Sequence, residues 1–207
     1  MNARSYGFYE DLVSEFFSKS WLMFHCIVFR RAAVKAELHS SRDIQIRKHF
    51  GMLLRKKIAY FSKAGADRRY RVRVDPLPTR YAREHEAVGN IVNAQLRKDL
   101  GDLRDDLDTP LLHDIRACDS ARTVGIQVSD VLLGAVLAAW QQQVSSAPKL
   151  KLLAHVAWQL GWNDLRSDTK PHVWKFNVWH FLGAGEPREV DTRPVKLRYP
   201  MPVWRPR

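Results

Sequence analysis

The chain has 207 residues, of which 45% are apolar, so its composition excludes a disordered protein and suits one α/β domain with a sizeable core. Its formal net charge is +12, which points to a polyanionic partner, nucleic acid before an anionic membrane, with an acidic protein subunit as the alternative. Two cysteines, no signal peptide and no uninterrupted membrane-spanning run indicate a cytoplasmic protein without a disulfide framework and not bound to a membrane.

The first 75 residues predict two helices and two strands. Apolar residues at helical spacing predict a helix over 6–17, and the dense apolar run over 21–29 predicts a buried strand. A second helix is expected over 42–61, followed by an alternating strand over 69–75. Asp75 ends this strand, a position where α/β folds often place ligand-binding groups. In the alternation of this strand Asp75 falls on the same face as the arginines, so a simple Arg–Asp ion pair is the alternative interpretation.

The region from residue 42 to residue 73 is strongly basic, with eleven Lys or Arg against two acidic residues. Like charges at this density repel one another, and a bound phosphate backbone would explain them. A solvated helix face is the alternative explanation. The candidate nucleic-acid contacts in this region are Arg47, Lys48, Arg55, Lys56, Arg71 and Arg73.

The second half of the chain predicts three helices, over 79–100, 126–140 and 150–160, and two strands, over 111–118 and 173–181. We expect one domain over 1–185, followed by a tail over 186–207 with five prolines and six Lys or Arg. This composition predicts an extended arm that wraps its own domain, a partner chain or nucleic acid.

The helix predicted over 126–140 is apolar almost all round, which predicts that it is buried in the middle of the fold. Asp130 is its one charged residue, and Gln127 lies one turn earlier on the same face. A buried ionised carboxylate is costly unless a cation or strong donors meet it. Asp130 is therefore a candidate metal ligand or catalytic residue. The alternatives are a pair with a buried arginine, or a helix end that reaches solvent.

Three segments resemble the domain-of-unknown-function family 3800. They are VRVD ending at Asp75, CDSARTVGIQVSDVLLGAV over 118–136, and KFNVWHF over 175–181. The resemblance implies a ribonuclease-H-like α/β fold, in which a mixed sheet is flanked by helices. It also implies a nuclease that uses Mg²⁺ or Mn²⁺, with carboxylates holding two metal ions about 3.5–4 Å apart.

By this resemblance Asp75 and Asp130 are metal ligands, and Asp119 is a third catalytic candidate. Gln127 and Ser120 would support the site. The alternative for Asp119 and Ser120 is that they are turn residues after the strand predicted over 111–118.

Members of this family usually open with a strand bearing D-E-S-G, which supplies their first metal-binding Asp, and this sequence contains no such motif. Three explanations remain open: the chain is a fragment, a partner chain or a second copy supplies the strand, or the site is inactive. We accordingly expect a nuclease or nuclease subunit. The alternatives are a non-catalytic nucleic-acid-binding subunit, or a protein-interaction subunit of a bacterial complex whose exposed sheet edge pairs with another chain.

Overall fold

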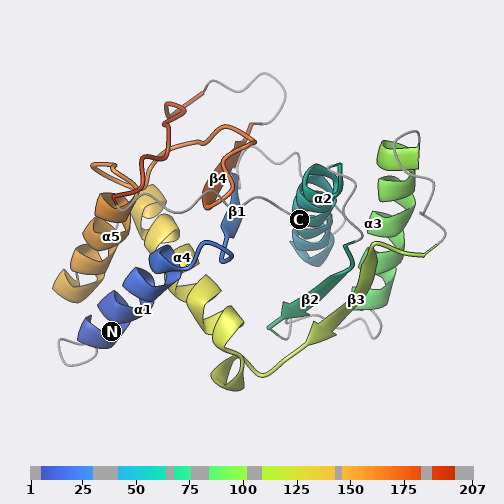
Figure 1. Cartoon of the computed structure of the whole chain (residues 1–207), viewed down its shortest axis with the longest axis horizontal. Coiled ribbons are helices and arrows are strands. Elements are labelled where there is room, and N and C mark those ends of the chain that lie inside the picture. The colour runs from blue at the N-terminus through green and yellow to red at the C-terminus, as the bar shows by residue number, and fades with distance from the viewer. Residues whose placement is uncertain are drawn as a thin grey trace. The chain divides into compact units, whose positions relative to one another are not determined.

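The computed structural model describes residues 6–29, 42–63, 68–75, 84–101, 109–142, 146–182 and 188–198 (Figure 1). By its internal contacts the chain divides into two compact units. Unit 1 comprises residues 1–34 and 127–205, and unit 2 comprises residues 35–126 and 206–207. Each unit contains one pair of parallel strands with helices against it, so the expected mixed α/β class is confirmed.

Unit 1 is built on two parallel strands that lie far apart in the sequence. Strand β1 (Phe24–Phe29) pairs with β4 (Phe176–Phe181) over their whole length, so that Phe24 lies opposite Phe176 and Cys26 opposite Val178. These four side chains are buried on the same face, as the period of two along a strand requires. The helices of unit 1 are α1 (Tyr6–Ser18), most of α4 (Val124–Gln141) and α5 (Ala147–Gln159).

The core of unit 1 lies between the β1–β4 face and these helices. One buried cluster joins Phe16 of α1, Val136 of α4, Val156 of α5 and Phe176 of β4. Burial of each such side chain contributes about 1.5–3 kcal/mol. This core fixes α1 and α5 against one another, which matters for the pocket described below.

A buried lysine closes the C-terminal end of α1. The side chain of Lys175 is 2% exposed, and its Nζ donates to the carbonyl oxygens of Phe16, Lys19 and Leu22 at 2.5, 2.7 and 2.9 Å. Carbonyls at the end of a helix lack intrahelical partners, and a cation there is favoured. Burial lowers the pKa of Lys175 to about 8, so the side chain is still predominantly an ammonium at pH 7.

Unit 2 is a β–α–β crossover with one further helix. Strand β2 (Tyr70–Val74), helix α3 (Glu84–Leu100) and parallel strand β3 (Leu112–Ala117) follow one another, and α2 (Arg42–Ser62) precedes them. The side chain of Asn93 on α3 joins helix to strand, because it donates to the Leu112 carbonyl at 2.9 Å and accepts from the Leu112 N–H at 3.0 Å.

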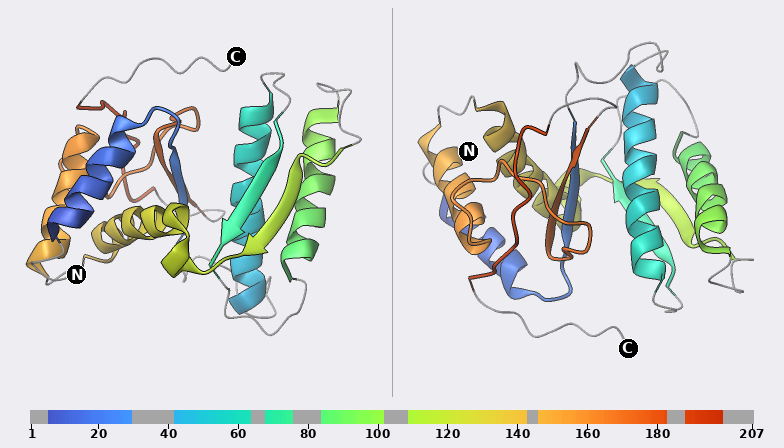
Figure 2. Two further views of the ribbon diagram at one scale, coloured as in Figure 1. Left: turned by 60° about the horizontal axis from the view of Figure 1, so that its bottom comes forward. Right: turned by 90° about the horizontal axis from the view of Figure 1, so that it is seen from above.

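Both helices of unit 2 lie on the same side of its two-stranded sheet (Figure 2). Val72 and Ile115 face them and pack on a cluster that includes Val92, Leu96 and Leu112. The other side carries polar residues from Arg71 onward in β2 and from Asp114 onward in β3, whereas Leu112 lies before the register shift and packs in the helix-side cluster. A β-strand presents successive side chains to opposite faces, so the apolar set fixes which residues the second face carries.

The described part of the tail, residues 188–198, lies against unit 1. Asp168 and Thr192 form an isolated parallel bridge, and the Lys196 N–H donates to the Leu160 carbonyl at 3.0 Å. Gly161 has φ +69°, and a Cβ there would lie 2.6 Å from the Lys196 carbonyl oxygen. Of the three uses expected for the tail, this part shows the contact with its own unit. The predicted boundary at residue 185, and residues 199–207, lie outside the described residues.

The helices and strands of the described residues fall within a few residues of their predicted ranges, although residues 79–83 of one predicted helix are not described. The expected burial of α4 on all sides is wrong. Its buried side carries Leu132 and Val136, but only 22% of the helix is buried, and Leu133 and Leu137 are 45% and 51% exposed. Asp130 is exposed as well. Its carboxylate is therefore solvated and does not require a buried cation, so burial gives no reason to assign it as a metal ligand.

By length and composition α4 would be able to cross a membrane, a test that core helices of soluble proteins also pass. Among the described residues it is the one helix that passes this test.

Candidate nucleic-acid interface and carboxylate edge

The side of the β2–β3 sheet that carries no helix of unit 2 is formed by Arg71, Arg73, Asp114 and Arg116, which we call the arginine face. Asp114 is its centre: Arg73 Nη1 lies 2.7 Å from Asp114 Oδ1, and Arg116 Nε lies 2.8 Å from Asp114 Oδ2. Arg71 stands opposite Asp114 in the strand register. Hydrogen bonding from Arg73, with the nearby positive charges, lowers the pKa of Asp114.

Two guanidinium groups, those of Arg73 and Arg116, share the one carboxylate on this face, and Arg71 adds a third positive charge, so the face is positively charged. Arg71 is exposed and forms no ion pair with any described residue. Arg116 is 69% exposed in its side chain, so both retain donors that reach solvent. Asp114 was not among the residues singled out from the sequence. The alternation of β3 places it on the arginine face, but the partner of Arg73 depends on the strand register.

The four basic candidates on α2 differ in what they can reach. Arg55 is bound on both sides of its fork by Asp99 of α3, with Nε to Oδ2 and Nη2 to Oδ1 each at 2.6 Å, and this contact lowers the pKa of Asp99. Arg55 thus joins α2 to α3. Lys48 and Lys56 are exposed, whereas Arg47 is half-buried.

The carboxyl ends of β2 and β3 bring two of the predicted acids to one sheet edge. Asp75 directly follows β2, and Cys118 and Asp119 directly follow β3. The Cys118 N–H donates to the Val74 carbonyl at 2.8 Å, so the parallel pairing continues to this point. The crevice beyond the carboxyl ends of parallel strands is where α/β folds bind ligands.

Asp119 also has a local role, as expected for a turn residue. It caps the short helix η5 (Ser120–Arg122), with its Oδ1 accepting from the Ala121 N–H at 2.9 Å. Its Oδ2 lies 3.6 Å from Nε of Arg122. Ser120 is the first residue of η5 and is half-buried. Asp119 keeps lone pairs for a further ligand, because a carboxylate accepts about four hydrogen bonds.

Asp130 and Gln127 belong to unit 1, on α4, whereas Asp75 and Asp119 belong to unit 2. Asp130 is exposed and Gln127 is half-buried. The structure thus brings together two of the three acids assigned by resemblance, at the edge of one sheet, and places the third on a different unit.

The Asp75–Asp119 edge offers two carboxylates as possible ligands for a divalent metal ion. No three His, Cys, Asp or Glu side chains within the described parts of the chain gather as a metal-binding group. Mg²⁺, however, is commonly held by one or two carboxylates, with waters and substrate phosphates as its other ligands. The two aspartates match that donor set.

The KFNVWHF segment has a structural explanation in this fold. Lys175 caps α1, and the buried Asn177 donates through Nδ2 to Thr169 Oγ1 at 2.7 Å and to the Lys170 carbonyl at 3.0 Å. A single lysine before an aromatic strand gives no sequence signal for a helix cap, because the two elements are more than 150 residues apart.

No protein-family model, curated protein or solved structure matches the chain. The resemblance to the domain-of-unknown-function family 3800 stays a prediction.

Proposed function

We propose that this protein binds nucleic acid in the cytoplasm and holds the phosphate backbone on the arginine face of unit 2. The observation that supports this is the arrangement around Asp114, where one carboxylate orders Arg73 and Arg116 while Arg71 remains exposed beside them. Arginine is suited to phosphate, because its planar fork donates two parallel hydrogen bonds. Ordering by Asp114 lowers the entropy lost when the side chains bind.

The spacing of the arginines on this face suits a phosphate backbone. Arginines on one side of a two-stranded sheet are spaced by the strand geometry, with side chains on one face repeating every two residues, about 6.6 Å. The spacing gives the guanidinium groups along β2 a regular separation, and single strands are bound through positively charged grooves that follow their backbone. The +12 net charge adds long-range attraction.

The test compares two double variants that remove equal charge. Arg71→Ala with Arg116→Ala removes two of the three arginines of the arginine face and keeps the Arg73–Asp114 pair. Lys149→Ala with Lys151→Ala removes the same charge from exposed positions of α5 in unit 1. Fluorescence anisotropy with a labelled 20-nucleotide strand should show at least tenfold weaker binding for the first variant and little change for the second. Equal losses in both would show that net charge, not this face, determines binding.

A second candidate function is metal-dependent cleavage of nucleic acid, favoured by Asp75 and Asp119 at the carboxyl ends of neighbouring parallel strands. On this proposal unit 2 is part of a ribonuclease-H-like fold, completed by a strand from a partner chain or a second copy. Bound Mg²⁺ or Mn²⁺ would activate water and neutralise charge on the phosphodiester. Asp75 and Asp119 would hold the ion, and the arginine face would position the backbone; the role of Asp130 as a metal ligand is proposed from the resemblance alone.

Cleavage is tested with a labelled strand and Mg²⁺ or Mn²⁺. Asp75→Asn, Asp119→Asn and Asp130→Asn should each lower the rate at least 100-fold, while Glu86→Gln on exposed α3 serves as the matched control. Unchanged cleavage in Asp130→Asn would remove its assigned role. Binding without turnover at any divalent-ion concentration would leave only the nucleic-acid-binding function.

A further inference from the structure

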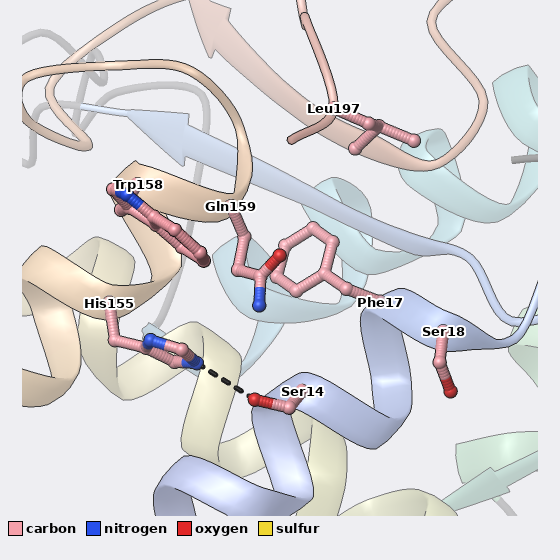
Figure 3. Close-up of a pocket in the computed structure, with 7 residues that line it drawn as sticks. All are labelled: Ser14, Phe17, Ser18, His155, Trp158, Gln159 and Leu197. Carbon is pink, nitrogen blue, oxygen red and sulfur yellow. Dashed lines mark hydrogen bonds between the residues drawn. The ribbon is translucent and has the colours of Figure 1, made fainter. Parts of the chain in front are cut away.

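Unit 1 contains a pocket of about 420 Å³ beside α1, α5 and the tail segment (Figure 3). Two polar pairs at helical spacing line it, Ser14 and Ser18 from α1 and His155 and Gln159 from α5. Residues four apart lie on the same face of a helix, so each pair lines one side of the pocket. Its other lining residues are apolar: Phe17, Trp158 and Leu197.

A serine and a histidine meet in this pocket, with a carboxylate behind them. Ser14 Oγ lies 3.0 Å from His155 Nε2, and His155 Nδ1 lies 3.9 Å from Glu10 Oε1. A carboxylate on the Nδ1 side favours the tautomer with its proton on Nδ1. Nε2 then accepts the Ser14 hydroxyl proton, which is the arrangement that turns a serine into a nucleophile.

The histidine is held in place by its surroundings. Its side chain is 14% exposed, and the Trp158 ring stacks on it with centroids 5.9 Å apart and an interplanar angle of 19°. Ser18, the other hydroxyl in the pocket, donates to the Glu15 carbonyl of its own helix at 2.8 Å. Of the two serines in the pocket, Ser14 is therefore the one whose hydroxyl is hydrogen-bonded to His155.

An amide donor completes the set. Gln159 is 4% exposed, and Figure 3 shows its carboxamide in the pocket with the nitrogen on the side of the Ser14–His155 pair. A side-chain amide can stabilise the negative oxygen of an acyl-transfer intermediate, as oxyanion-hole donors do. A contact that served only to join two helices would require neither the open volume beside the hydroxyl nor a second donor directed into it.

We propose that this pocket is an acyl-transfer site for small carboxylic esters with an apolar group, separate from the nucleic-acid function of unit 2. Ser14 Oγ forms a bond to the ester carbonyl carbon as its proton passes to His155 Nε2. The bond to the alcohol oxygen then breaks, and the alcohol leaves with that proton. Water attacks the acyl carbon and gives a proton to His155. The acid departs as Ser14 Oγ regains the proton.

The test is covalent labelling of the full chain with an alkyl fluorophosphonate, from which an activated serine displaces fluoride. Mass spectrometry should place the adduct on Ser14. Ser14→Ala should abolish it, and His155→Gln should slow it about 10²–10⁴-fold, the usual contribution of a general base. Ser146→Ala is the matched control, because Ser146 is the residue immediately before α5 and its side chain makes no capping hydrogen bond.

Circular dichroism shows whether each variant keeps its helices. Should His155→Gln unfold the chain, Glu10→Gln replaces it as the test of base assistance, because Glu10 is 43% exposed and its loss leaves the core intact. That variant should slow labelling at least threefold. The absence of an adduct, an adduct on another serine, or a labelling rate indifferent to both His155 and Glu10 would overturn the proposal.

Discussion

Replacing Lys175 with methionine removes the cation that closes the end of α1 while keeping a long apolar side chain in the core of unit 1. Three carbonyl oxygens lose their charged donor. Those of Phe16 and Lys19 also accept backbone N–H groups, at 3.4 and 3.2 Å, so they keep one weak partner each. The Leu22 carbonyl is left to find another donor.

The magnitude follows from these opposing contributions. An orphaned buried acceptor costs about 1–3 kcal/mol, and weakening two more acceptors adds about 1 kcal/mol. Methionine offsets part of this, because it packs without desolvating an ammonium. We expect a net loss of about 2–3 kcal/mol, a large part of the about 5–15 kcal/mol by which native domains are stable.

The assay is urea unfolding at pH 7, followed by tryptophan fluorescence. Lys170→Met is the matched control, because Lys170 is exposed and contributes its backbone carbonyl to Asn177 rather than its side chain. In thermal unfolding, the same loss of 2–3 kcal/mol would lower Tm by about 4–12 °C in a chain of this size. Equal stability of Lys175→Met and Lys170→Met would refute the role of Lys175 as a cap.

Three further predictions concern stability. Between pH 8 and 10.5 the unfolded chain binds more protons at Lys175 than the folded chain does, so the free energy of unfolding should rise with pH relative to that of Lys175→Met. Urea titrations of both proteins at pH 7.5 and 9.5 check this, and an unchanged difference between them would contradict it. Gly161→Ala should cost about 1–3 kcal/mol, because φ is +69° and the new Cβ meets the Lys196 carbonyl; a Tm unchanged in calorimetry would speak against that contact. Asn93→Ala should cost about 1–3 kcal/mol by leaving both backbone groups of Leu112 without this partner, and wild-type protection of the Leu112 amide in hydrogen exchange would argue otherwise.

The order of helices and strands could be predicted because their apolar residues repeat at periods of 3.6 and 2. The alternation around Tyr70–Val74 placed β2 to within one residue. The same reasoning failed for the environment of α4. Periodicity shows which residues of a helix are apolar, but the number of its sides that are covered depends on how much of the fold packs against it. Leu133 and Leu137 are apolar and exposed.

The candidate site shows the same division. Asp75 at the end of β2 follows from the sequence, since alternation stops there. Its neighbour across the sheet edge required the parallel register of β2 and β3, which places Cys118 beside Val74. Asp114 and Lys175 were missed because each acts through partners far along the chain, 41 residues for the Arg73–Asp114 contact. The Ser14–His155 contact joins residues 141 apart.

The most direct test of the central claim, that the arginine face holds phosphates, is the salt dependence of binding to a single strand. Each lost phosphate contact should reduce the slope of log K against log salt concentration by about 0.7. Arg71→Ala with Arg116→Ala should therefore have a slope smaller by about 1.4 than that of the wild type, while Lys149→Ala with Lys151→Ala keeps the wild-type slope. Identical slopes in all three proteins would contradict the account.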